Sequence, residues 1–598
     1  MAPTPQKQST EALPAIQYRI ELADLHAHLY RIALVIARPA ATQRVSLPVW
    51  IPGSYMVREF SKHLQQLTAR QGSHRVAVNQ LDKNSWEVQA NPAKPLVLDY
   101  EVYAFDSSVR TAWLDATRGF FNGTSLCLRV HGQEDLPHAL ELVAAKATAH
   151  WHVATGLATQ KVNKTGFGQY LAASYDELAD SPVEMGEFWS GEFKASGVPH
   201  RFVVAGAASS FDGQRLLADA RKICEAAIRF WHGSHKPPHK NYVFMLNAVD
   251  DGYGGLEHRN STALICNRRD LPRLGESRAT DGYTTLLGLI SHEYFHTWNV
   301  KRLRPAEFLR YQYDSEQYTQ MLWFFEGFTS YYDDLLLRRA GLLDDAGYLK
   351  LLNKTINQVQ QTPGRAIQSV AQSSMDSWIK YYRQDENTPN ATVSYYTKGA
   401  LVALCFDLTL RREGRSSLDE VMRGLWARCM AAPHSGAMSE ADFAAVLAEL
   451  GGRSFAPEIA AWVHGTDELP LKELLAQHGV TLHDDPAQWA QRLGLRVAET
   501  PGLQVKIVLR GGAAEQAGFA PGDEWLGVET EAGGWRMHKV DDLPFYAGQS
   551  QRVTALVARD KRLLRLSLAL PAQVSTARLA LHDAALAAPW LASTHTSG

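Results

Sequence analysis

The sequence predicts a multidomain α+β protein, and changes of pattern along its 598 residues indicate this class. Apolar and polar residues alternate through the N-terminal part, which is typical of strands with one buried face. Helical and strand-like runs then mix, and the C-terminal part returns to short strands separated by turns. We therefore expect a β-rich domain over residues 1–197, an α+β domain with a helical half over 198–482, a β domain over 483–571 and a tail over 572–598.

Composition and charge exclude several classes of function. The 61 basic and 63 acidic side chains nearly cancel, so we expect no general attraction to nucleic acid or to an anionic membrane. No run approaches the about 18 uninterrupted apolar residues of a membrane span. Five cysteines without C-x-x-C spacing are typical of free thiols in a reducing compartment. Residues 1–15 lack the apolar core of a secretion signal, so we expect a cytoplasmic protein, or a periplasmic one if a leader has been removed.

Two-residue periodicity predicts the N-terminal β domain. Apolar residues alternate with polar ones at Ile16, Tyr18, Ile20 and Leu22, and again at Leu98, Tyr100, Val102 and Ala104. Alternation of this kind predicts strands of an antiparallel sheet. The segment IPGSYMVREF, residues 51–60, is rich in distinctive residues. It either leans over the mouth of an active site or is an ordinary strand end followed by a turn, and the second interpretation is favoured.

The second domain begins where strands and helices start to mix. Residues 200–206 and 242–249 are apolar enough for short strands, and residues 211–231 form an amphipathic pattern between them. The inward face of this predicted helix holds Leu216, Leu217, Ala220, Ile223, Cys224, Ala227 and Ile228. This change of pattern sets the expected domain boundary near residue 197.

The stretch 286–298, LLGLISHEYFHTW, carries the pattern H-E-x-x-H at His292, Glu293 and His296. On a helix, positions i and i+4 lie on one face, so both imidazoles can reach one metal ion. A zinc-bound water has its pKa drawn toward neutrality, and Glu293 can accept a proton from it and pass the proton to a leaving amine. The alternative is a pair of packed or surface histidines. The apolar surroundings favour a metallopeptidase site, because buried histidines and a buried glutamate need partners.

Ahead of this helix, two glycines precede Glu257 in the segment DGYGGLEHRNSTALICN, residues 251–267. Gly254 and Gly255 permit a close backbone approach, as at an edge strand that receives a peptide. Glu257 is then a candidate site for the ammonium group of a substrate. The alternative is a solvated turn residue, which is the usual role of a glutamate after a glycine pair.

Two further residues complete the candidate site. Catalytic zinc typically has three protein ligands, and Glu326 is a lone carboxylate in an aromatic run, where an unpaired charge is costly. Its alternative role is an ion pair with Arg302 or Arg304. Tyr396, at the start of a predicted helix, is placed to donate a hydrogen bond to a developing oxyanion, although most tyrosines at such positions only pack.

The remainder of the chain is predicted as helices followed by a β domain. Capping boxes that begin at Ser417 and Ser439 predict two helix starts. The charged segment 482–486 contains a proline and predicts a hinge. Residues 488–570 are again strand-like, and the tail after Pro571 predicts a short docking helix that then frays.

Four motifs in this order resemble those of the gluzincin aminopeptidases: GGLEH at 254–258, HEYFHTWN at 292–299, FEGFTSYY at 325–332 and YTKGA at 396–400. More narrowly, HEYFHTWNVKRLRP, at 292–305, resembles the glycyl aminopeptidase family. That family combines a β-rich N-terminal domain, a thermolysin-like catalytic domain and a C-terminal PDZ domain. The resemblance therefore implies this architecture for most of the chain.

The resemblance also implies a role for each motif residue. His292, His296 and Glu326 would hold one Zn²⁺ per chain, and Glu293 would be the general base. Glu257, on a strand with Gly255, would hold the free α-amine of the substrate, and Tyr396 would stabilise the tetrahedral intermediate.

This chain departs from the larger aminopeptidase group in two places. Twenty-nine residues lie between His296 and Glu326, more than in that group, and His258 replaces the usual asparagine after Glu257. The second departure puts the amine-binding role in doubt. The added length includes Lys301, Arg302 and Arg304, which either bind the distal carboxylate or the backbone of a substrate or are solvated or salt-bridged, and the latter is favoured.

In the C-terminal β domain, Leu493-Gly494-Leu495 and the segment 510–528 resemble the PDZ domains attached to proteases. Such a domain binds the C-terminus of a peptide by strand addition. The alternative is a blocked groove that serves only for packing.

Three functions follow. The leading one is a zinc aminopeptidase that removes a small N-terminal residue, glycine or alanine, from peptides with a free N-terminus. The second is a thermolysin-like endopeptidase in which Glu257 is structural. The third is a peptide-binding scaffold whose PDZ unit is the working part, and the complete set of motif residues disfavours it.

Overall fold

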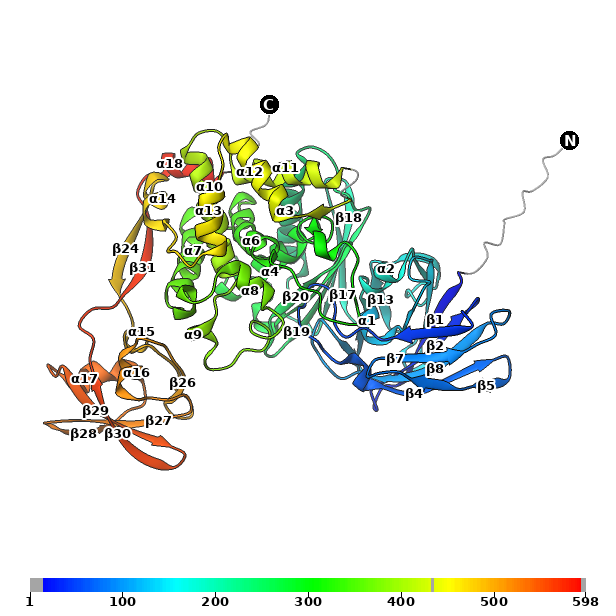
Figure 1. Cartoon of the computed structure of the whole chain (residues 1–598), viewed down its shortest axis with the longest axis horizontal. Coiled ribbons are helices and arrows are strands. Elements are labelled where there is room, and N and C mark those ends of the chain that lie inside the picture. Colours follow the sequence, from blue (N-terminus) through cyan, green and yellow to red (C-terminus); the bar gives the residue numbers. More distant parts are fainter. Residues whose placement is uncertain (1–13, 432–434, 593–598) are drawn as a thin grey trace. The chain divides into compact units, whose positions relative to one another are not determined.

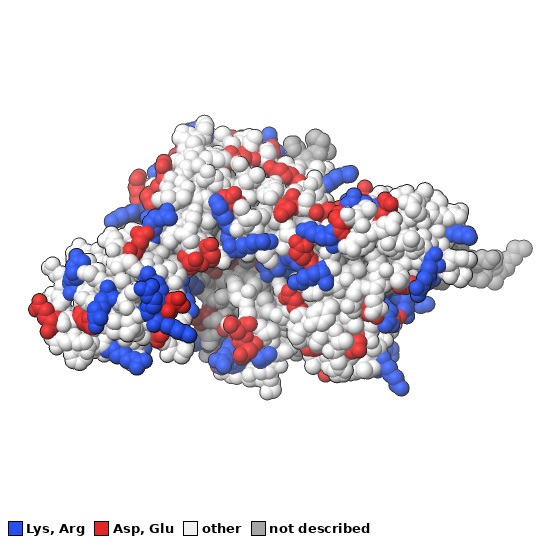
Figure 2. Space-filling view, turned by 60° about the horizontal axis from the view of Figure 1, so that its bottom comes forward, with Lys and Arg blue, Asp and Glu red and all other residues white. Residues whose placement is uncertain are grey.

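The computed structural model describes residues 14–431 and 435–592. It divides into two compact units, one comprising residues 1–228, 234–302 and 310–317 and the other the rest of the chain. None of the described helices combines the length and the apolarity that a membrane span requires. On the face drawn in Figure 2, acidic and basic side chains are interspersed, with no broad area of one sign.

The first unit opens with the predicted β domain, drawn in blue and cyan in Figure 1. Its largest sheet has eight strands. The predicted alternation is confirmed there, because the apolar residues at every second position of β1 and β8 are buried. In sheet order the strands are β14 (Ala158–Val162), β15 (Gly168–Ala172), β12 (His138–Val143), β1 (Ile16–Asp24), β2 (Leu29–Ile36), β8 (Leu96–Tyr103), β4 (Leu64–Gln71) and β5 (His74–Val76).

Two four-stranded sheets complete this β region and share its apolar core. The first contains β13 (His152–Thr155), β16 (Val183–Gly186), β10 (Arg118–Phe121) and β9 (Ala112–Leu114). The second contains β11 (Arg129–Val130), β3 (Thr42–Ser46), β7 (Ser85–Gln89) and β6 (Val78–Gln80). A short helix, α2 (Tyr175–Ala179), precedes β16.

A five-stranded sheet follows in the same unit. Its order is β17 (Trp189–Ala195), β18 (Val198–Ala205), β19 (Tyr242–Val249), β21 (Ser261–Asn267) and β20 (Gly254–Glu257), so β20 is an edge strand. The predicted strands at 200–206 and 242–249 and the helix at 211–231 are confirmed; the helix, α3 (Gly213–His232), buries the expected apolar face. The expected boundary at residue 197 falls within the β17–β18 hairpin, and we propose that the boundary lies before Trp189.

The second unit is mostly helical up to residue 477. Its principal helices are α5 (Leu322–Phe325), α6 (Gly327–Arg339), α7 (Asp345–Gln360), α9 (Thr388–Ala391), α10 (Thr397–Arg412), α11 (Leu418–Met430), α12 (Glu440–Gly451) and α14 (Leu471–Gln477). Both predicted capping boxes are confirmed, because Ser417 and Ser439 accept hydrogen bonds from the backbone of α11 and α12. These caps satisfy amide groups that a helix leaves unpaired at its start.

The predicted hinge at 482–486 is wrong. These residues belong to β24 (Val480–Pro486), which pairs along its whole length with β31 (Ser575–Leu581). Helix α18 (Ala584–Leu591) then docks as expected, since Trp590 is buried and donates a hydrogen bond to the Tyr331 hydroxyl at 3.0 Å. The predicted fraying concerns residues 593–598, which lie outside the described residues.

Between β24 and β31 lies a six-stranded sheet with its own apolar core. It contains β25 (Leu495–Ala498), β26 (Gln504–Val508), β27 (Glu524–Thr530), β29 (Arg552–Arg559) and β30 (Arg562–Ala569) in sheet order, with β28 (Gly533–Arg536) paired to β27. Short helices α15 (Trp489–Leu493), α16 (Ala513–Ala517) and α17 (Leu543–Ala547) accompany it.

Candidate active site

The helix α4 (Asp281–Phe295) carries the H-E-x-x-H pattern. Thr280 caps its start by accepting a hydrogen bond from the Tyr283 amide at 3.0 Å, and His296 closes it with helical dihedral angles. The two imidazoles therefore lie on one face, with their Nε2 atoms 3.1 Å apart. Nδ1 of His296 donates a hydrogen bond to the Asn299 carbonyl at 2.7 Å, which fixes the ring with Nε2 facing His292.

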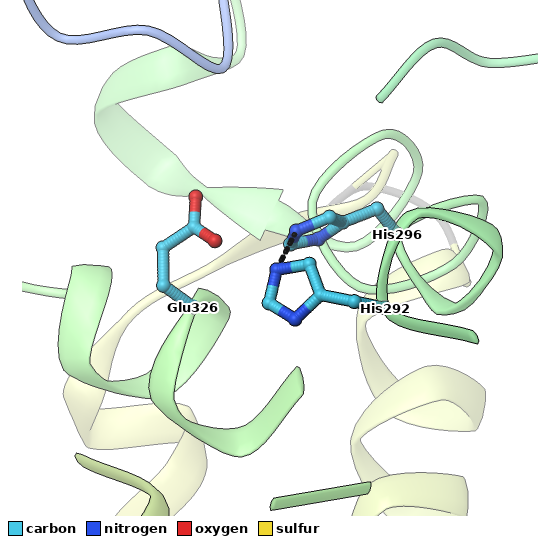
Figure 3. A group of neighbouring side chains, drawn as sticks. All are labelled: His292, His296 and Glu326. Atoms are coloured by element: carbon cyan, nitrogen blue, oxygen red, sulfur yellow. Dashed lines mark hydrogen bonds between the residues drawn. The ribbon is translucent and has the colours of Figure 1, made fainter. Parts of the chain in front are cut away.

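Glu326 joins these histidines, as Figure 3 shows. The carboxylate and the two imidazoles each offer a ligand atom, and the ligand atoms lie within 4.8 Å of one another. Two imidazoles and a carboxylate are a ligand set of catalytic zinc, so the residues fit that ion. Arg302, the alternative partner of Glu326, donates instead to the carbonyls of Thr297 and Arg259, at 2.8 and 2.9 Å.

A close crossing of two helices positions Glu326 and Tyr396. A Cβ atom built on Gly327 would lie 2.6 Å from the Gly399 Cα, and one built on Gly399 would lie 2.9 Å from the Gly327 Cα. Any side chain at either position would push α6 and α10 apart. Glu326 immediately precedes α6 and Tyr396 immediately precedes α10, so the crossing holds both residues at the starts of their helices. This contact explains why each motif contains a glycine at these places.

Tyr396 is held in a cluster of aromatic rings. Its ring stacks on Tyr395 and on Tyr381, with centroids 4.8 and 5.3 Å away. Burial, and next the Glu326 carboxylate, hold the pKa of the Tyr396 phenol well above its ordinary value. The hydroxyl therefore stays protonated near neutral pH, as a hydrogen-bond donor must.

The edge strand β20 lies directly against Glu293. A Cβ atom built on Gly255 would fall 2.1 Å from Glu293 Oε1, so a side chain at this position would require the carboxylate or the strand to move. Two residues farther along the strand, Glu257 offers an oxygen within 4.8 Å of ligand atoms of Glu293 and His296. The group of Glu257, Glu293 and His296 shares His296 with the group of His292, His296 and Glu326. Because Nδ1 of His296 is bonded to the Asn299 carbonyl, the ring has only Nε2 to offer to a metal. Glu257 and Glu293 are therefore a carboxylate pair beside the candidate metal site.

Glu257 is buried, with 4% of its surface exposed, and the solvated-turn interpretation is wrong. Among the described residues, its Oε1 atom has no hydrogen-bond partner. The turn at residues 51–54 covers the carboxylate, because a Cβ atom on Gly53 would lie 2.5 Å from both of its oxygens. Gly53 also has a φ of +95°, which favours glycine. The segment IPGSYMVREF thus contains the turn that was favoured, and this turn also lies against a candidate site residue.

Asp180, which follows α2, explains both the unusual His258 and the basic segment after α4. Its carboxylate pairs with Lys301 at 2.7 Å and His258 at 3.1 Å, and it accepts a hydrogen bond from the Arg259 amide at 2.9 Å. Burial opposes both charges of the Asp180–Lys301 pair, yet pairing outweighs it: the pKa of Asp180 lies well below its usual value and the pKa of Lys301 above. The favoured salt-bridged role is confirmed for Lys301.

Sequence reasoning missed three residues near the site: Gly53 as a contact of Glu257, Asp180 as an anchor, and Arg110, whose Nη2 donates a hydrogen bond to the Gly255 carbonyl at 2.9 Å. All three belong to the β region that precedes β17, far from the motifs in sequence. The distinctive residues of IPGSYMVREF were a signal for Gly53, whereas nothing in the surrounding sequence distinguishes Asp180 or Arg110.

Comparison with known proteins identifies the family. A family model described as the peptidase M61 N-terminal domain matches residues 17–187, and one described as M61 glycyl aminopeptidase matches residues 285–402. The chain is similar to the crystal structure of an aminopeptidase N family protein from Idiomarina loihiensis, with 36% identity and a TM-score of 0.91 over 96% of this chain and 100% of that one.

A more distant similarity is to an M1 zinc metallopeptidase from Deinococcus radiodurans, with 14% identity and a TM-score of 0.48 over 76% of this chain and 94% of that one. A comparison with curated proteins found no match. On the family models and the full-length match, the chain belongs to the M61 glycyl aminopeptidase family and is a metallo-aminopeptidase, and its two histidines and glutamate form a set that fits zinc.

Proposed function

We propose that this enzyme removes a small N-terminal residue, glycine or alanine, from peptides with a free α-amine. The observation that carries this proposal is the buried Glu257 carboxylate on β20, whose Oε1 has no hydrogen-bond partner among the described residues. A buried carboxylate oxygen without a hydrogen-bond partner is costly, and a second carboxylate, Glu293, lies nearby. The ammonium group of a substrate brings three hydrogen-bond donors for the Glu257 oxygen and a positive charge between the two carboxylates.

The turn at Gly53 supports an exopeptidase rather than an endopeptidase. Its backbone packs on the Glu257 carboxylate, so space on that side is already filled. A residue ahead of the amine would have to displace the turn, which is held by a hydrogen bond from the Ser54 amide to the Ile51 carbonyl at 3.0 Å. The preference for glycine or alanine follows from the family rather than from pocket residues.

In this proposal each residue of the site has one task. His292, His296 and Glu326 hold the zinc ion, which when bound polarises the scissile carbonyl and acidifies a water molecule. Glu293 accepts a proton from the attacking water and delivers it to the leaving amine. Tyr396 donates its hydroxyl hydrogen to the oxygen that becomes negative in the transition state. Glu257 fixes the α-amine, and Gly255 lets the peptide backbone approach β20.

The test compares a glycine-initiated peptide with its N-acetylated form, each with and without a chelator, using wild-type protein and a Glu257→Gln variant. We expect chelator-sensitive release of glycine from the free peptide only, and a loss in kcat/KM of about 10- to 100-fold in the variant, because a charged hydrogen bond is removed. Equal cleavage of the free and acetylated peptides would favour the endopeptidase, and no cleavage of either would favour the scaffold.

We further propose that residues 488–570, the unit between β24 and β31 in the sequence, form a PDZ-like domain that binds the C-terminus of a peptide. Strand β25 supports this assignment, since it pairs with β26 on one side only among the described strands and follows Gly494, whose φ is +73°. An exposed strand edge after a glycine loop suits peptide addition. Peptides with a free C-terminus should bind more tightly than their C-terminal amides; equal or absent binding would indicate a groove used for packing.

We also propose a reducing compartment, in keeping with a cytoplasmic location. All five cysteines are buried and free, and burial holds the pKa of the Cys127 thiol well above its usual value. Such thiols are structural and need no oxidising environment. Localisation of the tagged protein by cell fractionation tests this assignment, and recovery with the periplasmic fraction would contradict it.

A further inference from the structure

A peptide bound as proposed has a defined direction along β20, and this inference rests on that proposed function. Its amine lies at Glu257, and its scissile carbonyl lies near Glu293, which packs against Gly255. The path from Glu257 to Gly255 therefore runs from the first residue of the substrate toward the scissile bond. The residues released after cleavage continue in the same direction, toward Gly254 and the group that contacts it.

That group is Arg110. Its Nη2 atom donates a hydrogen bond to the Gly255 carbonyl at 2.9 Å, and a Cβ atom on Gly254 would lie 3.6 Å from its Nη1. The guanidinium and the general base thus contact the same residue of the strand, Gly255. Because a strand advances about 3.3 Å per residue, a group one or two residues beyond the scissile bond falls within reach of the guanidinium.

The turn that carries Arg110 is well braced. It joins β8 to β9, and the Asn122 side-chain amide donates to the carbonyls of Val109 and Thr111 at 2.9 and 3.2 Å. The Thr111 hydroxyl donates to the Ser108 carbonyl at 3.0 Å. These bonds hold the backbone on both sides of Arg110, so its position at the strand does not depend on a bound substrate.

Arg110 also has no counter-ion. Within residues 14–431 and 435–592, no carboxylate pairs with its guanidinium, and its buried Nε has no hydrogen-bond partner. By contrast, Lys301 is paired with Asp180, and Arg302 is bonded to backbone carbonyls. Arg110 is thus a basic side chain at β20 that is left with donors for an anion.

We propose that Arg110 binds the C-terminal carboxylate of a short peptide, so that the enzyme prefers dipeptides and tripeptides with a free C-terminus. Guanidinium groups match the geometry of carboxylates and form charge-assisted hydrogen bonds with them. The site then binds both ends of its substrate, the amine through Glu257 and the carboxylate through Arg110. A longer peptide keeps the first contact and loses the second.

The test measures kcat/KM for glycylglycine and for glycylglycine amide, which differ only in the C-terminal charge. We expect wild-type protein to favour the free acid by about 10- to 100-fold, the Arg110→Gln variant to lose that preference, and the Arg110→Lys variant to keep part of it. The ratio of kcat/KM for glycylglycine to kcat/KM for glycylglycine amide is compared within each variant. A general loss of activity or folding therefore does not alter this ratio.

The Arg268→Gln variant is the matched control. Its guanidinium also donates to two carbonyls at the same sheet, that of Gly206, which follows β18, and that of Ala248 in β19. It should retain the wild-type preference. Equal rates for the acid and the amide in wild type, or an unchanged preference in Arg110→Gln, would overturn the role of Arg110. Cleavage of N-acetylated peptides would instead refute the proposed function.

Discussion

A Gly255→Ala substitution tests the contact between β20 and the general base. The added methyl carbon would lie 2.1 Å from Oε1, 2.4 Å from Cδ and 2.5 Å from Cγ of Glu293. Ordinary contacts with carbon are about 3.5–4.0 Å, so the strand or the carboxylate must move by roughly 1 Å. A displacement of that size at a catalytic group lowers kcat by about 100-fold. The accompanying strain destabilises the folded protein by about 1–3 kcal/mol.

The assay combines the kcat for a fluorogenic glycyl amide with the zinc content of the purified variant. The three atoms nearest to the new methyl group all belong to Glu293 and none to the metal ligands, so we expect zinc binding to persist while kcat falls. Gly156→Ala is the matched control, because its nearest neighbours lie at an ordinary 3.5 Å. A Gly255→Ala variant with kcat within twofold of the wild type would refute the proposed packing of Glu293 against β20.

Three further predictions follow from buried groups. Glu326→Gln should weaken zinc binding by at least about tenfold, measured by competition with a chelator; unchanged affinity would exclude Glu326 as a ligand. Asp180→Asn leaves Lys301 buried without its counter-ion and should lower the unfolding free energy in urea at pH 7 by about 3 kcal/mol. Because the pKa of Asp180 is lowered on folding, this difference should hold above about pH 4 and shrink in stronger acid. Burial lowers the pKa of His138 to about 4, so only the unfolded chain takes up its proton as the pH falls from about 6.5. The resulting loss of stability, at most about 3 kcal/mol by pH 4, should be absent in His138→Gln when urea unfolding is compared across that range; an equal loss in both proteins would contradict it.

The local elements of the site could be predicted from the sequence because they depend on short-range patterns. The spacing of His292 and His296 matches one helical turn, and α4 places both on one face. Glu326 stood out as the lone carboxylate in an aromatic run, and it lies beside these histidines. The strands of the N-terminal region were equally visible, because each has one buried face.

Contacts between residues far apart in the chain were not predictable in this way. The approach of Gly53 to Glu257 and the pairing of Asp180 with Lys301 depend on how the β region packs against the five-stranded sheet. The segment 482–486 was misread because charged residues with a proline are typical of linkers. Its pairing with β31, about ninety residues later in the sequence, leaves no local signal.

The most direct test of the proposed active site is a crystal structure of a Glu293→Gln variant, loaded with zinc and soaked with a glycine-initiated tripeptide. We predict zinc on His292, His296 and Glu326, and the α-amine of the peptide within hydrogen-bond distance of the Glu257 carboxylate. A peptide whose amine lies elsewhere, or one whose chain extends past the turn at Gly53, would contradict the assignment of Glu257 as the residue that makes this enzyme an aminopeptidase.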